Sequence, residues 1–186
     1  MRKKAITIAL GLLVLVLLAG NFKVASAHQW WAWHWGVGLW HFWERPSKNL
    51  GVWVYGSYSA ESNAALNDWR SRLSGIFTFT SVGSHTDVSL YAGNYGATDW
   101  GGLASIENYD YDWWHGWCWC KITHAHARTN TYWWTGTGLQ GVQCQEFGHT
   151  LGLDHSNTGD CMGKTYYNSI NVTSSHNRSD ISSMYP

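Results

Sequence analysis

The side chains with the clearest chemical potential in this chain lie around Glu146. Gln145 and His149 are four residues apart, so on a helix they point to one side, with Glu146 next to them. Gly152 tolerates the positive φ that ends a helix, and a turn there can bring His155 back toward His149. Two imidazoles, an amide oxygen and a carboxylate at one point are groups that hold a metal ion and move a proton.

The spacing follows a zinc-binding pattern in all but one position. In the pattern His-Glu-x-x-His-x-x-Gly-x-x-His, three imidazoles hold zinc and leave a position open for water, whose pKa falls to roughly 7. Gln145 stands where the first His belongs. The other pattern positions are filled as expected by Glu146, His149, Gly152 and His155. We therefore expect zinc to be held by His149, His155 and, more weakly, Gln145. Glu146 is the expected general base.

The opposite side of the same helix is expected to face a core. Cys144, Phe147 and Leu151 follow the spacing i, i+3, i+7 of a buried stripe. The pattern predicts a helix over residues 138–151, which ends at Gly152.

Hydrophobic patterning predicts the elements that must position this helix. A helix is expected over 60–74, with Ser59 as its N-cap, and a short one over 180–184. A Gly-rich loop is expected over 93–102. The strand over 121–127 should carry Ile122, His124 and His126 on one face. Strands are expected over 50–55, 76–81, 87–92 and 121–127, which are rich in β-branched and aromatic residues. Strands first and the main helix later indicate an α+β domain.

The N-terminus is typical of a secretory signal peptide, residues 1–27. Basic residues at 2–4 precede an apolar run over 5–20, and Ala25-Ser26-Ala27 is a small-x-small cleavage site. A retained membrane anchor is the alternative, although the apolar run is short for a span. We expect a secreted, extracellular chain of one domain, 28–186, without stable membrane insertion after cleavage.

The charge of the mature chain argues against nucleic acid as a partner. The signal segment holds four of the twelve basic residues and none of the twelve acidic ones, which leaves eight against twelve, a net charge of −4. Binding to phosphates requires clustered Lys and Arg.

Four cysteines in a secreted chain indicate two disulfide bonds. A bridge between Cys144 and Cys161 would close a short loop around His155, and we expect it. For Cys118 and Cys120 three alternatives stay open: a bond to each other, a bond elsewhere, or a metal cluster with a nearby His.

The chain resembles the metzincins, and within them the matrixin-like metallopeptidases secreted by bacteria. The zinc motif carries the resemblance, and Met162 would be the Met of the turn beneath the zinc. Looser similarity extends over most of residues 40–186. The resemblance implies a twisted mixed β-sheet above a cleft, with the zinc helix at its floor. It also implies hydrolysis of protein or peptide substrates by a metal-activated water.

Two functions compete at this point. One is a secreted zinc endopeptidase. The other is a catalytically weak or inactive metzincin-fold binding protein, because the amide of Gln145 is a weaker donor than imidazole. The chain has fifteen Trp residues, several of them in the lead segment 28–43. If exposed, they would form a binding surface for protein or glycan; otherwise they would pack over the sheet. His124 and His126 are candidates for a second metal. The zinc content of the purified protein would discriminate between the two functions.

Overall fold

The computed structural model describes residues 40–42, 48–84, 87–114, 117–156, 159–163 and 171–185. The side chains of residues 40–42 and 110–121 lie outside that description. The expected signal peptide, 1–27, and nearly all of the Trp-rich lead segment, 28–43, also lie outside it.

Within the described ranges, six strands form one mixed sheet. Strands β3, β2, β4 and β6 are parallel neighbours in that order. Strand β5 runs antiparallel to β6 along its other edge, and the short β1 pairs with β6 in parallel. The strands are β1 (Trp40–Phe42), β2 (Asn49–Gly56), β3 (Thr78–Ser81), β4 (Val88–Gly93), β5 (Gly102–Trp114) and β6 (Trp117–Asn130).

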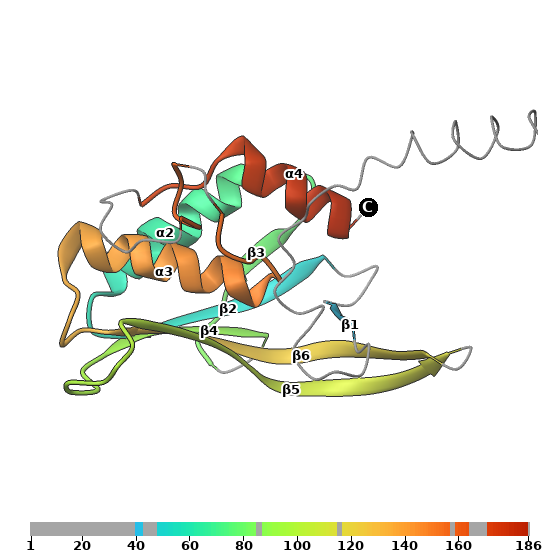
Figure 1. Cartoon of the computed structure of the whole chain (residues 1–186), viewed down its shortest axis with the longest axis horizontal. Coiled ribbons are helices and arrows are strands. Elements are labelled where there is room, and N and C mark those ends of the chain that lie inside the picture. Colours follow the sequence, from blue (N-terminus) through green and yellow to red (C-terminus); the bar gives the residue numbers. More distant parts are fainter. Residues whose placement is uncertain are drawn as a thin grey trace, which may run out of the picture.

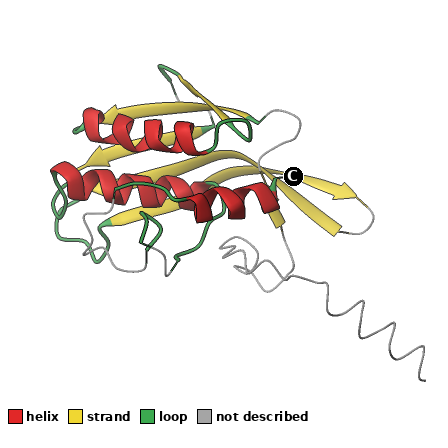
Figure 2. Ribbon diagram, turned by 90° about the horizontal axis from the view of Figure 1, so that it is seen from above, coloured by secondary structure: helices red, strands yellow, loops and turns green. Residues whose placement is uncertain are grey.

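Among the described residues, three helices form. They cover one face of the sheet, as Figures 1 and 2 show. They are α2 (Ser59–Arg72), α3 (Gly136–Thr150) and α4 (Ser175–Met184). In the described part of the chain, no helix is long and apolar enough to cross a membrane.

The hydrophobic core fills the space between helices and sheet. Alternate residues of β2, β4 and β6 point into it because side chains of a strand alternate between its two faces. Fully buried members of this core are Val52, Leu66, Trp69, Leu90, Ala125, Ala127, Phe147 and Leu151. The expected α+β class is confirmed, and the expected core stripe of α3 is buried.

The start of α2 differs from the prediction by one residue. Ser59 is the first residue of the helix, so it is not the N-cap. Tyr58 is the N-cap, with a φ of 59°, and its side chain makes no capping hydrogen bond. The chain enters the helix through this left-handed residue and through Gly56, with a φ of 88°. A backbone turn therefore replaces the predicted side-chain cap.

Strand β5 is the longer of the two strands that the predictions missed, the other being the three-residue β1. Strand β5 follows the Gly-rich loop directly and pairs with β6, which is longer at both ends than the predicted 121–127. A period-2 signal was present in the alternation Tyr-Asp-Tyr-Asp over 109–112. Acidic residues are rare in strands, and they obscured it.

An irregularity in the β5–β6 pairing corrects the predicted face of β6. Asn108 lies opposite His124, but Tyr109 lies opposite Ile122, so one residue of β6 is passed over. Such a bulge moves the side chains beyond it to the other face. Ile122 therefore joins the core, whereas His124 and His126 contact each other with ring centroids 4.6 Å apart.

Candidate functional site

Helix α3 carries its polar side chains into the interior. Its second half, 143–150, is buried on all sides. Trp69 of α2 donates a hydrogen bond from Nε1 to the carbonyl oxygen of Cys144, 2.9 Å away. Burying polar groups is costly unless each has a partner or a use. The polar side chains on this half of α3 therefore define the candidate site.

Gly152 ends the helical region as predicted. Its φ is 97°, and its backbone N–H donates to the carbonyl oxygen of His149 at 2.9 Å. The N–H of Leu153 donates to the carbonyl oxygen of Gly148 at 3.2 Å. The chain turns back here and carries His155 toward the helix.

The two motif histidines converge. Their Nε2 atoms lie 3.2 Å apart, and their ring centroids lie 4.8 Å apart. A tetrahedral zinc ion with Zn–N bonds of about 2.0–2.1 Å holds two nitrogens roughly 3.3–3.4 Å apart. His149 and His155 therefore have the spacing of two ligands of one zinc ion.

The surroundings of His149 fix its tautomer. Its Nδ1 lies 2.7 Å from the carbonyl oxygen of Leu153. A carbonyl only accepts, so Nδ1 carries the hydrogen and Nε2 presents a lone pair. Burial lowers the pKa of His149 to about 4, which keeps the ring neutral. Neutral imidazole is the form that binds metals.

Gln145 is held by one end of its amide. Its Nε2 donates to the carbonyl oxygen of Gly163 at 2.7 Å, which fixes which way the amide faces. Its Oε1 is buried and has no hydrogen-bond partner among the described residues. A buried amide oxygen without a donor suits a cation ligand. Among the described residues, no three or more His, Cys, Asp or Glu side chains gather to hold a metal.

Glu146 lies against the outer edge of β5. Its side chain is nearly inaccessible, at 3% exposure. Burial raises the pKa of Glu146 to about 8, and a hydrogen bond from the backbone N–H of Ala104 partly offsets this rise. A Cβ built on Gly102 would lie 2.2 Å from Glu146 Oε1. Nothing in the sequence indicated this contact, because β5 itself was not predicted.

Met162 lies beneath α3, against Gly148. It is fully buried, and a Cβ built on Gly148 would lie 2.3 Å from its sulfur and 2.9 Å from the ring of Trp69. Gly148 directly precedes His149, so a glycine here lets Met162 approach the helix closely.

A disulfide bond joins α3 to the Met162 segment. Cys144 and Cys161 are bonded, with Cα atoms 5.9 Å apart, which confirms the expected bridge. It closes the loop that carries His155. For Cys118 and Cys120 only the strand register is described: they lie opposite Trp113 and Tyr111. Their pairing stays open because their side chains lie outside the described residues.

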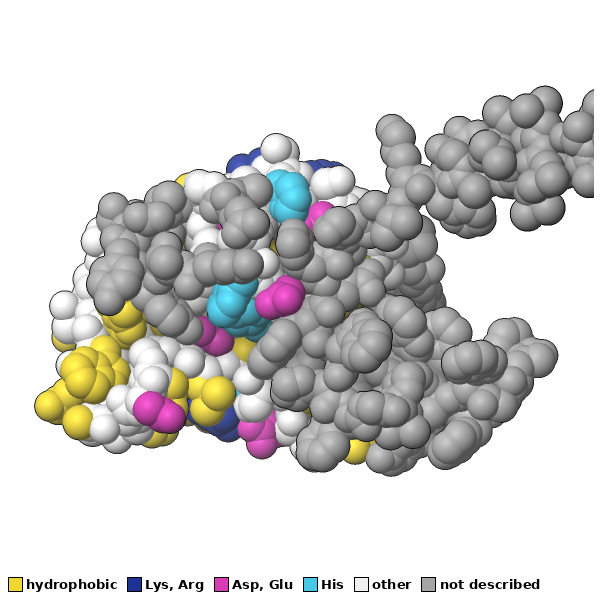
Figure 3. All heavy atoms as spheres, viewed as in Figure 1, with side chains coloured by type: hydrophobic (Ala, Val, Ile, Leu, Met, Phe, Trp, Pro, Cys, Tyr) yellow, Lys and Arg dark blue, Asp and Glu magenta, His cyan; other side chains and the backbone are white. Residues whose placement is uncertain are grey.

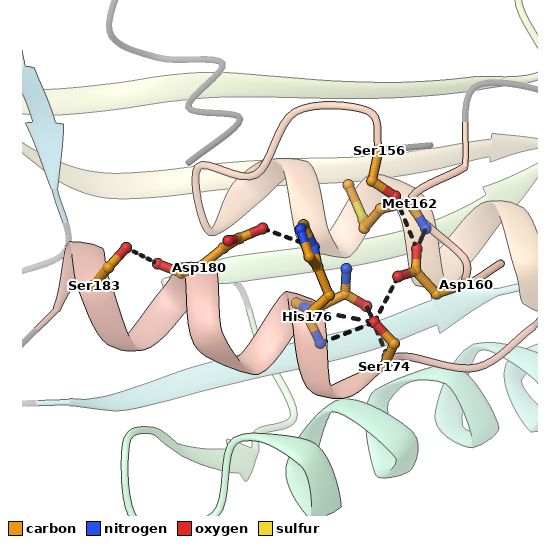
Figure 4. Close-up of polar contacts among 8 residues, drawn as sticks. Ser156, Asp160, Met162, Ser174, His176, Asp180 and Ser183 are labelled. Carbon is orange, nitrogen blue, oxygen red and sulfur yellow. Dashed lines mark hydrogen bonds and ion pairs between the residues drawn. The ribbon is translucent and has the colours of Figure 1, made fainter. Parts of the chain in front are cut away.

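Asp160 organises the loop that carries His155, as Figure 4 shows. Its Oδ1 accepts from the backbone N–H of Met162 at 2.9 Å and from the hydroxyl of Ser156 at 3.2 Å. Its Oδ2 accepts from the hydroxyl of Ser174 at 2.6 Å. Ser174 is the N-cap of α4 and forms a capping box with Asn177. The predicted C-terminal helix thus exists and begins earlier than expected.

His155 is half-buried, so the site reaches the surface on one side. Figure 3 shows histidine side chains on this face, with acidic side chains beside them.

His124 and His126 belong to a different cluster, on the face of the sheet opposite the helices. Arg128 approaches His126 Nδ1 to 2.6 Å and binds Glu107 at 2.6 Å. Arginine only donates, so Nδ1 of His126 is the acceptor and Nε2 carries the hydrogen. The second metal site considered from the sequence, at His124 and His126, stays a prediction.

No protein-family model matches the chain, and no curated protein matches its sequence.

Proposed function

We propose that the protein is a secreted zinc-dependent endopeptidase of matrixin-like metzincin type. The observation that carries this proposal is the convergence of His149 Nε2 and His155 Nε2, 3.2 Å apart. The buried carboxylate of Glu146 is carried by the same helix, three residues before His149. A pair of imidazoles and a shielded carboxyl group form the minimum set for hydrolysis by an activated water.

The residues present fit zinc. His149 and His155 would supply nitrogen donors, and Gln145 would supply its Oε1, which the bond to Gly163 leaves without a donor. The carbonyl of Leu153 orients the ring of His149. When bound at such a site, zinc lowers the pKa of a water molecule and polarises a substrate carbonyl.

Glu146 would take a proton from the attacking water and pass it to the leaving amine. Its raised pKa, near 8, suits a group that must both accept and release a proton close to neutral pH. Burial keeps bulk water away from the carboxylate and so strengthens its interactions.

The outer edge of β5 would hold an extended peptide. The N–H of Asn130 on β6 donates to the carbonyl of Gly101, so residues 101 and 103 face β6 while 102 and 104 face outward. Exposed backbone groups on an edge strand pair with an added strand. The outward N–H of Ala104 already contacts Glu146, so a peptide along this edge would pass the base.

A binding protein with a weak metal site is the second candidate. Gln145 favours it, because a neutral amide oxygen binds zinc more weakly than imidazole. The buried carboxylate of Glu146 favours the peptidase, because a binding surface has no use for a carboxylate beneath the surface.

The test measures zinc content and peptide cleavage in the same preparations. Wild type should bind one zinc and cleave peptides from a broad library. Glu146→Gln should keep the zinc and lose about 10²–10⁴-fold in kcat. Glu61→Gln is the matched control, since Glu61 lies in the first turn of α2, and it should behave as wild type. A wild type that binds zinc but cleaves no peptide would rule out the peptidase and favour the binding protein.

A further inference from the structure

The Glu146 carboxylate lies against β5, a strand that carries no residue of the zinc-binding pattern. The carboxylate accepts the backbone N–H of Ala104 and lies against the Cα of Gly102. Both contacts come from backbone, so the side-chain pattern of the motif does not reveal them.

Gly102 leaves room for the Glu146 side chain because it has no side chain of its own. A Cβ at this position would lie 2.2 Å from Oε1 and 2.7 Å from Cδ of Glu146, and 2.6 Å from Val142. Real Cβ atoms essentially never come within 3.0 Å of such neighbours. Gly102 has no positive φ, so backbone conformation does not require a glycine here. Space for the carboxylate is the remaining reason.

We propose that Gly102 is a positioning residue for Glu146: the absent side chain allows the carboxylate to reach the N–H of Ala104 and fixes the base against the edge of β5. The inference about catalysis rests on the proposed peptidase function. The inference about position does not.

A methyl group added at Gly102 would displace whichever neighbouring atoms move most easily. The strand is fixed by its pairing with β6, Gly102 opposite Thr129 and Ala104 opposite Ala127. The far end of the glutamate side chain is flexible. In Gly102→Ala the carboxylate should therefore swing away and release the Ala104 N–H, while the sheet stays in place.

Hydrogen exchange of the Ala104 amide tests the position directly. In wild type this outward N–H is held by a carboxylate. In Gly102→Ala its exchange should become about tenfold faster, since its hydrogen bond to Glu146 is lost. It should reach the rate seen in Glu146→Ala. The Leu103 amide, which faces β6, should be unchanged in all variants.

Catalysis gives the second measurement. With cleavage established, Gly102→Ala should lower kcat by about 10²-fold, the cost of misplacing a catalytic group by roughly an ångström. Zinc content should stay near the wild-type value, because the proposed ligands Gln145, His149 and His155 have not changed. Gly83→Ala is the matched control, since nothing lies within 4 Å of its Cβ and its φ is not positive.

The outcomes separate the two ideas. Unchanged exchange of the Ala104 amide in Gly102→Ala overturns the positioning role, whatever the activity. Full kcat in Gly102→Ala, with Glu146→Gln inactive, overturns its catalytic consequence and leaves the peptidase standing. Faster exchange in a protein that cleaves nothing establishes the positioning role and sinks the proposed function.

Discussion

Four buried polar side chains on α3 are held in four different ways. Gln143 donates from Nε2 to the carbonyl of Tyr91 at 3.0 Å and so ties the helix to β4. Gln145 ties it to Gly163, Glu146 accepts from Ala104, and His149 is fixed by Leu153. Each bond orients one atom of the side chain. A helix that served only as core would need none of these groups.

Replacing Gln145 with His should tighten zinc binding. Changes to groups that merely orient a ligand alter metal affinity by about 10–100-fold, so a better ligand should do at least as much. An imidazole also carries an N–H that can take over the bond to the Gly163 carbonyl. Competition titration with a zinc chelator measures the affinity of Gln145→His against wild type.

Gln140→His is the control for this prediction. It introduces the same residue on the same helix, at a partly exposed position beside Asn171. Its zinc affinity should equal that of wild type. If Gln145→His binds zinc no more tightly than Gln140→His, residue 145 does not face the metal.

Among the helices and strands, the features predicted from the sequence are those set by residues close together in the chain. The ends of α3, its core stripe and the turn at Gly152 all follow from neighbours a few residues apart. Strand β5 carried a local period-2 signal that its acidic residues obscured. Its contact with Glu146 joins residues about 40 apart in the sequence, and no local pattern predicts it. The bulge that moved Ile122 to the core is likewise a property of two strands together.

Asp160 should be a large contributor to the stability of the loop that carries His155. Its carboxylate is 4% exposed and accepts three hydrogen bonds, from Ser156, Met162 and Ser174. Asp160→Ala leaves those donors buried and should lower the free energy of unfolding by about 2–4 kcal/mol. Urea denaturation measures the loss.

Asp99→Ala serves as its comparison, because Asp99 is exposed. That change should stay within about 0.5 kcal/mol of wild type. Equal stability of the two variants would mean that the Asp160 contacts contribute nothing to folding.

The disulfide should stabilise the same loop independently. Cys144 and Cys161 are 17 residues apart, and a loop of that size gains about 2–4 kcal/mol from closure. The double substitution Cys144→Ala/Cys161→Ala should lose this free energy and bind zinc more weakly, because the loop holding His155 gains freedom. Denaturation and zinc titration measure both effects. A double variant that keeps the wild-type zinc affinity would show that Asp160 and α4 alone fix the loop.

The described part of the chain is a sheet covered by helices on one face, with the candidate site where α3 meets the start of β5. The proposed ligands come from two separate segments, the helix and the returning loop. A metal that joins two segments binds the folded chain and not the unfolded one. We therefore expect binding of the proposed zinc to be linked to global stability.

Zinc should raise the melting temperature, and chelation should lower it. At free zinc of 100 times the dissociation constant, the linkage is worth about 2.7 kcal/mol. His149→Ala should abolish the response to zinc. His176→Ala should keep it, because His176 lies on α4 and pairs with Asp180. Differential scanning calorimetry with and without zinc measures the shift. An identical response in all three proteins would place the zinc elsewhere.

The combination of parallel and antiparallel strands in the sheet also affects how the chain folds. Strands β5 and β6 are joined by a short hairpin, and hairpins close in about 1–10 μs. Strand β2 must instead find β4 across 36 residues, Val52 opposite Val88, and β4 must find β6 across a similar distance. Pairings between distant residues cost loop entropy before any contact compensates for it. The hairpin should therefore form first and present β6 as the template on which the parallel strands assemble, in the slower range of milliseconds to seconds.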